Sequence, residues 1–148
     1  MYQKILVPVD GSATSTLGLQ EAIKVAKLTG ATIKLLHVID ETSFMTSLEG
    51  GIGLTAEMLQ AIKLAGEQVL KDAVTQVSLA GVKVETALLE SYTGRVSDLV
   101  IDQSVEWGAN LIVLGTHGRR GVKRMLLGSD AEQVLRLATV PVLLVRAE

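Results

Sequence analysis

The chain has 148 residues, of which 48% are hydrophobic and 20% are charged, with 14 basic side chains, 16 acidic ones and no cysteine. This length and this mixture predict one compact domain over residues 1–148 and exclude a disordered chain. The near balance of charge excludes a basic surface for nucleic acid, and the lack of cysteine excludes disulfides, thiol chemistry and cysteine-ligated metals.

The first part of the chain predicts a strand, a helix and a second strand. Residues 5–9 are an apolar run that ends at the turn signal Asp10-Gly11-Ser12. A helix-length segment follows and ends at Gly30, and residues 31–38 form the second apolar run. The first run is too short to span a membrane or to serve as an export signal, so we expect a cytoplasmic protein without a membrane partner.

The middle of the chain predicts a loop, a long helix, a strand and another helix. Polar residues and glycines dominate residues 40–55, which we expect to form a loop. Apolar residues then recur every three or four positions in a long helix that is closed by Gly81. A strand over residues 82–89 and a helix that ends at Gly108 follow.

The last part of the chain completes a regular alternation. Residues 110–114 predict the fourth strand, a helix follows Gly128, Ser129 and Asp130, and residues 142–145 form a last apolar run. Strand and helix thus alternate four times before the final strand. This order predicts an α/β fold in one domain, a doubly wound five-stranded parallel sheet with strand order 3-2-1-4-5.

The segment that joins the fourth strand to the last helix carries the strongest functional signal. It has glycines at 115, 118, 121 and 128, and its basic residues are Arg119, Arg120, Lys123 and Arg124. Glycines let the backbone approach an oxyanion, and a helix N-terminus and cations stabilise its charge, so the segment predicts a phosphate cradle. The alternative is that the glycines only form a tight turn and that the cations are a solvated face.

The predicted strand order brings a second polar turn to this cradle. Strands 1 and 4 are neighbours whose connections leave to opposite faces, so Asp10-Gly11-Ser12 and Gly115-Thr116-His117-Gly118 flank one crevice. Asp10 can there meet a ribose hydroxyl or a phosphate-bound Mg²⁺, and it can equally form an N-cap or Asx turn. The two roles are compatible. We expect His117 to be a solvated loop histidine, because no metal-binding spacing accompanies it.

The same residues resemble a known family. The spacing Gly115-x2-Gly118-x9-Gly128-Ser129, with ILVPVDGS near the start and VPVLLVR near the end, is similar to the ATP-binding members of the universal stress protein family. This resemblance covers almost the whole chain. It implies an adenine-nucleotide-alpha-hydrolase-like fold, ATP or AMP as the ligand, and a homodimer through residues 142–145.

The resemblance also implies which residues line the site. It places Val38 close to the base, and Pro8, Val9, Asp10 and Ser12 near the nucleotide. The residues expected at ribose and phosphates, or beside them in the same loop, are Gly115, Thr116, His117, Gly118, Arg119, Gly128 and Ser129.

These observations predict an adenine-nucleotide-binding regulatory protein of the stress response, with Mg²⁺ as a companion of bound phosphates. No base or water-positioning group can be named, so we expect no catalytic residue and at most slow, incidental ATP hydrolysis. A slow ATPase or nucleotidyl-transfer enzyme on the same fold is the alternative, and a dimerisation module without nucleotide affinity is a third hypothesis. Asp130 would compete with an anion at the helix N-terminus, which leaves the number of phosphates open.

Overall fold

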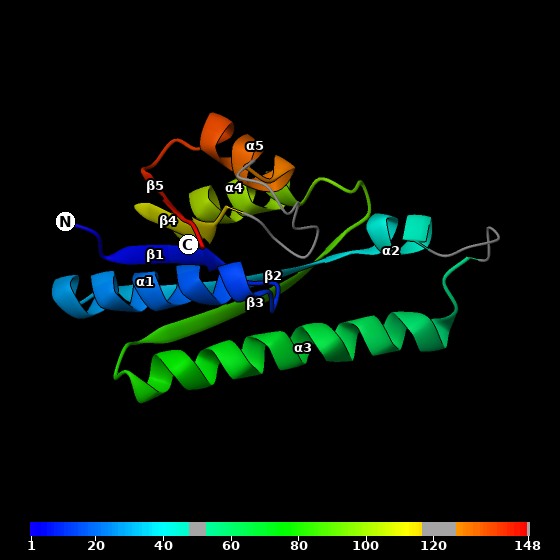
Figure 1. Ribbon diagram of the computed structural model, residues 1–148, viewed down its shortest axis with the longest axis horizontal. Coiled ribbons are helices and arrows are strands. Elements are labelled where there is room, and N and C mark those ends of the chain that lie inside the picture. Colours follow the sequence, from blue (N-terminus) through cyan, green and yellow to red (C-terminus); the bar gives the residue numbers. More distant parts are fainter. Residues whose placement is uncertain (48–52, 117–126, 148) are drawn as a thin grey trace.

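The computed structural model describes residues 1–47, 53–116 and 127–147 (Figure 1). Its strands form one parallel sheet with the order β3-β2-β1-β4-β5, which confirms the predicted topology. The strands are β1 (Lys4–Pro8), β2 (Thr32–Asp40), β3 (Val84–Ser91), β4 (Leu111–Gly115) and β5 (Val142–Val145). The helices are α1 (Ala13–Thr29), α2 (Glu41–Ser47), α3 (Ala56–Leu79), α4 (Val96–Trp107) and α5 (Ser129–Leu137).

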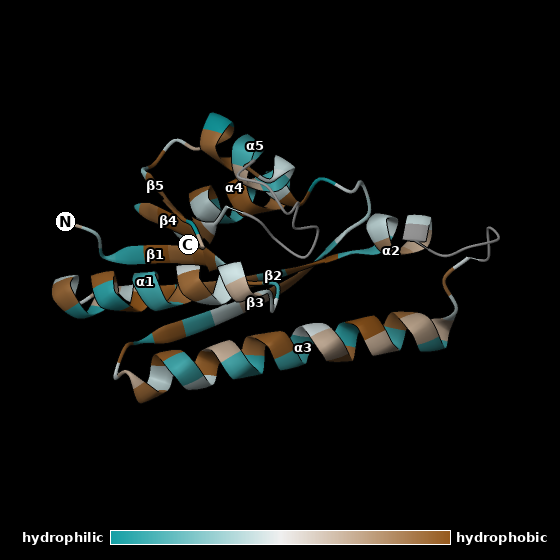
Figure 2. Cartoon of the chain, in the orientation of Figure 1, coloured by the Kyte–Doolittle hydropathy of each residue, from teal (hydrophilic) through white to brown (hydrophobic). Residues whose placement is uncertain are grey.

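The sheet is covered on both faces, as a doubly wound fold requires. Helices α1 and α3 lie on one face, and α4 and α5 lie on the other (Figure 1). Along β1 the side chains of Ile5 and Val7 belong to the core layer beneath α1 and α3, whereas Leu6 belongs to the layer beneath α4 and α5. The central strands are therefore apolar on both faces, which Figure 2 shows as brown over β4 and over β1 beyond its hydrophilic first residue.

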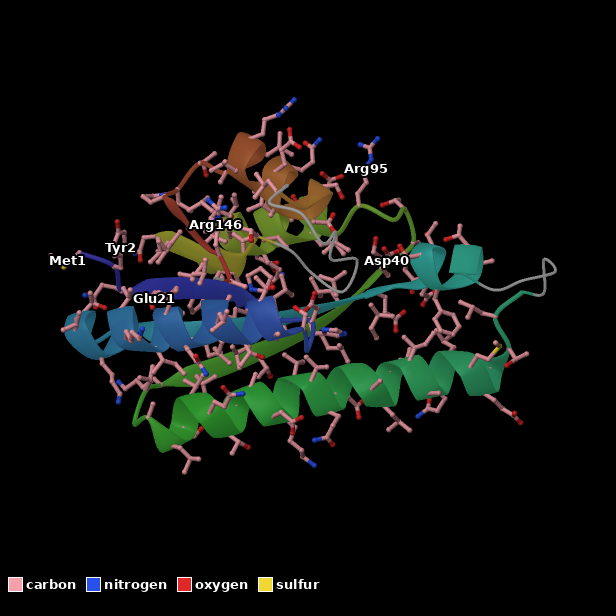
Figure 3. The ribbon with its side chains drawn as sticks, viewed as in Figure 1. Met1, Tyr2, Glu21, Asp40, Arg95 and Arg146 are labelled. Carbon is pink, nitrogen blue, oxygen red and sulfur yellow. The ribbon has the colours of Figure 1, made fainter. Side chains whose placement is uncertain are left out.

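The prediction of a loop over residues 40–55 was wrong at its start, where α2 occupies Glu41–Ser47. Asp40 begins this helix, because its carboxylate accepts the Ser43 amide at 3.0 Å and also the Ser43 hydroxyl. Asp40 lies where β2 runs into α2 (Figure 3). A polar helix of seven residues has little apolar periodicity, so hydrophobic patterning does not reveal it.

Strands β2 and β3 both end two residues beyond the predicted ends, and β3 also begins two residues later than predicted, because the two strands pair with each other over eight residues. Their register runs from Ile33↔Val84 to Asp40↔Ser91. The predicted ends of two helices are confirmed. Gly30 and Gly108 are left-handed C-caps with φ of 71° and 70°. Within the described ranges, no helix combines the length and the apolarity that crossing a membrane requires.

Candidate functional site

The turn after β1 is held by its own side chains. Oδ1 of Asp10 accepts the Ser12 amide at 2.8 Å, and Oγ of Ser12 accepts the Ser15 amide at 3.1 Å as the N-cap of α1. Oγ of Ser15 in turn accepts the Asp10 amide at 3.1 Å. The structure thus confirms the Asx turn at Asp10, whereas the N-cap of α1 is Ser12 and not Asp10. A carboxylate accepts several hydrogen bonds, so this turn does not prevent Asp10 from meeting a ligand hydroxyl.

The end of β4 lies directly against the first turn of α1. A Cβ atom on Gly115 would lie 2.8 Å from the backbone C and O atoms of Thr14, and one on Gly18 would lie 3.2 Å from the Gly115 nitrogen. Real Cβ atoms do not approach that closely, so only glycine at 115 permits this contact. The ends of β1 and β4 therefore lie side by side at the start of α1, as predicted from the strand order.

The two ends of the glycine-rich segment are joined by a backbone hydrogen bond. The Gly128 amide donates to the Thr116 carbonyl at 2.7 Å, and the Thr116 amide donates to the Val145 carbonyl at 2.9 Å. Gly128 and Ser129 consequently stand beside the end of β4. The predicted site residues His117, Gly118 and Arg119 lie outside the described residues, as does the rest of 117–126.

Helix α5 begins where the phosphate cradle needs a helix N-terminus. Gly128 is its N-cap and Ser129 its first residue, so the predicted helix is present and begins two residues earlier than expected. Gly128 has no side chain that could cap the first amides, in contrast to Ser12 at the start of α1. Asp130 and Glu132 lie in the first turn, where their charge offsets part of the positive end of the helix.

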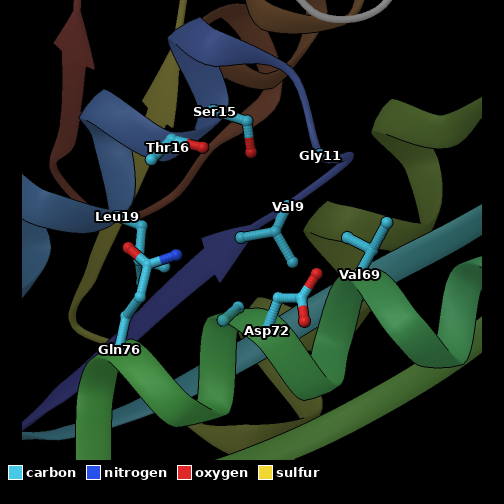
Figure 4. Close-up of a pocket in the computed structure, with 9 residues that line it drawn as sticks. Val9, Gly11, Ser15, Thr16, Leu19, Val69, Asp72 and Gln76 are labelled. Atoms are coloured by element: carbon cyan, nitrogen blue, oxygen red, sulfur yellow. The ribbon is translucent and has the colours of Figure 1, made fainter. Parts of the chain in front are cut away.

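The remaining predicted residues lie on the central strands. Pro8 ends β1 and is paired in register with Leu36 of β2. Val38 is two residues further along β2 and packs against the core layer beneath α4 and α5. On the opposite face, α1 and α3 enclose a cavity of about 170 Å³ that reaches Val9 and Gly11 (Figure 4). The strands thus separate Val38 from this cavity.

Sequence reasoning missed His37 as a neighbour of the site. Its Nδ1 atom lies 2.7 Å from the carbonyl oxygen of Val9, although the two residues are 28 positions apart. The predicted pairing of strands 1 and 2 was the available signal, because it brings the end of β2 beside the end of β1.

A second polar cluster lies at the end of β3. Nζ of Lys63 is 2.8 Å from Oε1 of Glu90, and the Tyr92 hydroxyl donates to Oε2 of Glu90 at 2.6 Å. The hydrogen bond from Lys63 and the one from Tyr92 lower the pKa of Glu90 below its ordinary value. The Glu90 carboxylate raises the pKa of Lys63 and of Tyr92 in return.

The described part of the chain contains no group of three or more His, Asp or Glu side chains that could hold a metal ion.

Fold and site together define a doubly wound α/β domain in which β1 and β4 end side by side at the switch point of the sheet, which is where such sheets bind ligands. The chain belongs to the universal stress protein family, whose model matches residues 1–146.

Individual proteins of the family resemble the chain over nearly its whole length. Universal stress protein MJ0531 of Methanocaldococcus jannaschii is 36% identical over 147 residues, which are 99% of this chain and 83% of that protein. The solved structure of MJ0577 superposes with a TM-score of 0.83 at 26% identity and covers 100% of this chain and 98% of its own. The structure of the universal stress protein from Archaeoglobus fulgidus in complex with dAMP has a TM-score of 0.69 at 26% identity, covering 97% and 98%.

Proposed function

We propose that this protein binds an adenine nucleotide, ATP or AMP, in the crevice between the ends of β1 and β4, and that the bound nucleotide regulates its conformation or its partners in the stress response. The observation that carries the proposal is the contact of Gly115 with Thr14, which brings the β4 end against the start of α1. The dAMP complex of the Archaeoglobus fulgidus relative supports the choice of an adenine nucleotide.

The chemistry of the two turns gives the nucleotide a direction. Asp10 supplies carboxylate oxygens, which accept hydrogen bonds from ribose hydroxyls and repel phosphate. The start of α5 supplies backbone amides that no N-cap side chain covers, which attract phosphate. The ribose would therefore face the β1 turn and the phosphates would face Gly128 and Ser129, with the base toward Val38. A Mg²⁺ ion would enter with the phosphates.

We further propose that two copies of the chain associate through β5, an edge strand of the sheet. The carbonyls of Pro141 and Val145 accept hydrogen bonds from β4. Alternate residues of a parallel strand point their amides to opposite sides, so the amides of Val142 and Leu144 face the open edge. An apolar strand with such an edge favours pairing with a second chain. A cytoplasmic location belongs to the same proposal.

Two measurements test nucleotide binding. The first is mass spectrometry of the ligand retained on purification, which should identify an adenine nucleotide. The second is calorimetric titration with AMP and with ATP, each with and without Mg²⁺. If neither nucleotide binds at millimolar concentration, the proposal fails.

A variant of Gly128 links the binding to the site. Its backbone, with φ of −60° and ψ of 150°, is one that any residue adopts, so Gly128→Val should fold normally. Its bulk beside the first amides of α5 should weaken AMP binding by at least tenfold. Gly53→Ala is the control, because a Cβ atom there meets nothing within 4 Å. If Gly128→Val binds AMP with unchanged affinity, the phosphates do not bind at this helix end.

A further inference from the structure

The side chain of His37 is hydrogen-bonded to the backbone of Val9, the residue that precedes the Asp10 turn. His37 is 7% exposed, and its Nδ1 atom lies 2.7 Å from the Val9 carbonyl oxygen. A carbonyl oxygen can only accept, so Nδ1 carries the proton and donates it. The bond joins β2 to the point where the backbone leaves β1, and it ties a buried ring to the backbone of the proposed nucleotide site.

Helix α3 leaves the ring of His37 little freedom to turn. A Cβ atom on Gly66 would lie 2.8 Å from Cδ2 and 3.1 Å from Nε2 of His37. A glycine inside a helix costs about 1 kcal/mol relative to alanine, and here it makes room for the imidazole between α3 and the sheet. The ring edge that carries Cδ2 and Nε2 therefore faces the helix backbone, and Nδ1 is directed at Val9.

Two side chains form hydrogen bonds to the same peptide group, one to its oxygen and one to its N–H. The carbonyl of Val9 and the amide of Asp10 belong to one planar unit. His37 holds the oxygen of this unit, and Oγ of Ser15 accepts its N–H at 3.1 Å. Because the unit is rigid, these two hydrogen bonds fix its rotation about the chain, and this rotation sets the direction in which the Asp10 side chain leaves the backbone.

We propose that His37 is a positioning residue of the nucleotide site: through the Val9 carbonyl it orients the Val9–Asp10 peptide, and so aims the Asp10 carboxylate at the ribose. This inference rests on the proposed nucleotide binding at the β1 turn. It assigns His37 no contact with the nucleotide. Its effect on affinity comes from the orientation of Asp10 in the free protein, which the ligand would otherwise have to impose.

Isosteric variants separate positioning from simple packing. The amide nitrogen of asparagine takes the place of Nδ1, whereas that of glutamine takes the place of Nε2. His37→Asn should therefore keep the hydrogen bond to Val9 and bind AMP within about threefold of the wild-type affinity. His37→Gln and His37→Leu should bind AMP about tenfold more weakly, because the nucleotide must then impose the orientation of Asp10. Gly66→Ala, which displaces the ring, should resemble them.

The same variants give a readout that needs no nucleotide. Amide hydrogen exchange at Asp10 and Ser12 should stay slow in the wild type and His37→Asn, and it should become faster in His37→Gln. A merely structural histidine would lower the melting temperature and the affinity together, whichever nitrogen is replaced. Equal AMP affinities, or equal exchange rates, in the asparagine and glutamine variants would overturn the inference. A wild-type protein that binds no AMP, but shows the expected exchange pattern, would overturn only the proposed function.

Discussion

Replacing Gly115 by alanine tests whether the site is built on the close approach of β4 to α1. The added Cβ atom would meet the backbone C and O atoms and the Cγ2 atom of Thr14, each at 2.8 Å. Ordinary van der Waals contact begins at 3.4 Å, so the two elements must separate by several tenths of an ångström. Since two of these atoms belong to the helix backbone, rotation of a side chain cannot relieve the contact.

The expected loss of stability follows from two opposing effects. Overpacking against a rigid neighbour costs about 1–3 kcal/mol. Removing a glycine restricts the unfolded chain and returns about 0.4–1 kcal/mol. The net loss is about 1–2 kcal/mol, which lowers the melting temperature of a domain of this size by about 2–8 °C. The separation also shifts the start of α1 relative to Gly128, so AMP affinity should fall by at least tenfold.

Thermal unfolding and AMP titration measure the two effects, and Gly30→Ala is the matched control. Gly30 has φ of +71° and nothing within 4 Å of an added Cβ atom. Alanine there is strained by about 1 kcal/mol without displacing the site. Gly30→Ala should therefore lose comparable stability and keep its affinity for AMP. The reasoning is refuted if Gly115→Ala melts like the wild type, or if it loses stability and still binds AMP as Gly30→Ala does.

Three further changes have definite expected outcomes. Glu90→Gln should lower the free energy of unfolding at neutral pH, measured by urea unfolding across pH. Its difference from the wild type should shrink below pH 4.5, as the lowered pKa of Glu90 is crossed, and again above pH 10, as the raised pKa values of Lys63 and Tyr92 are crossed. Leu144→Pro removes an outward amide of β5 and should shift a dimer toward monomer in sedimentation. Leu144→Ala keeps the amide and should leave the dimer unchanged. A wild-type protein that sediments as a monomer at micromolar concentration would contradict the proposed dimer. Asp130→Ala should raise the affinity for ATP by about two- to fivefold and that for AMP by less, and equal gains in calorimetry would contradict the charge argument.

The fold was predictable from the sequence because its signals are periodic and local. Alternating apolar runs gave the element order, and glycines at 30 and 108 marked helix ends that the structure confirms. The exact extent of β3 was not predictable, since the register with β2 is set by the neighbouring strand. Helix α2 was not predicted, because its only signal is the local cap at Asp40 and no periodic row of apolar residues accompanies it.

The side-by-side position of the β1 and β4 ends was also predictable, because topology alone decides which strand ends are neighbours. The contacts that fix the atoms of the site were not. A glycine at 115 suggests a turn as readily as a close approach to Thr14, and only the packing of α1 on β4 distinguishes the two. The hydrogen bond from His37 to Val9 could not be predicted from residue spacing either, because it joins two neighbouring strands whose bonded residues are far apart in the sequence.

The two helix starts at the crevice are built differently, and this difference decides what each can bind. At α1 the Ser12 hydroxyl already engages the Ser15 amide, and the Asp10 carboxylate stands before it, so an anion gains little there. At α5 a glycine replaces the capping side chain, so no N-cap side chain engages the backbone amides that would meet phosphate oxygens. The same end carries Asp130, whose charge opposes each added phosphate. The affinity for the nucleoside part should therefore depend on the β1 turn and on His37, whereas the preference between AMP and ATP should depend on the first turn of α5.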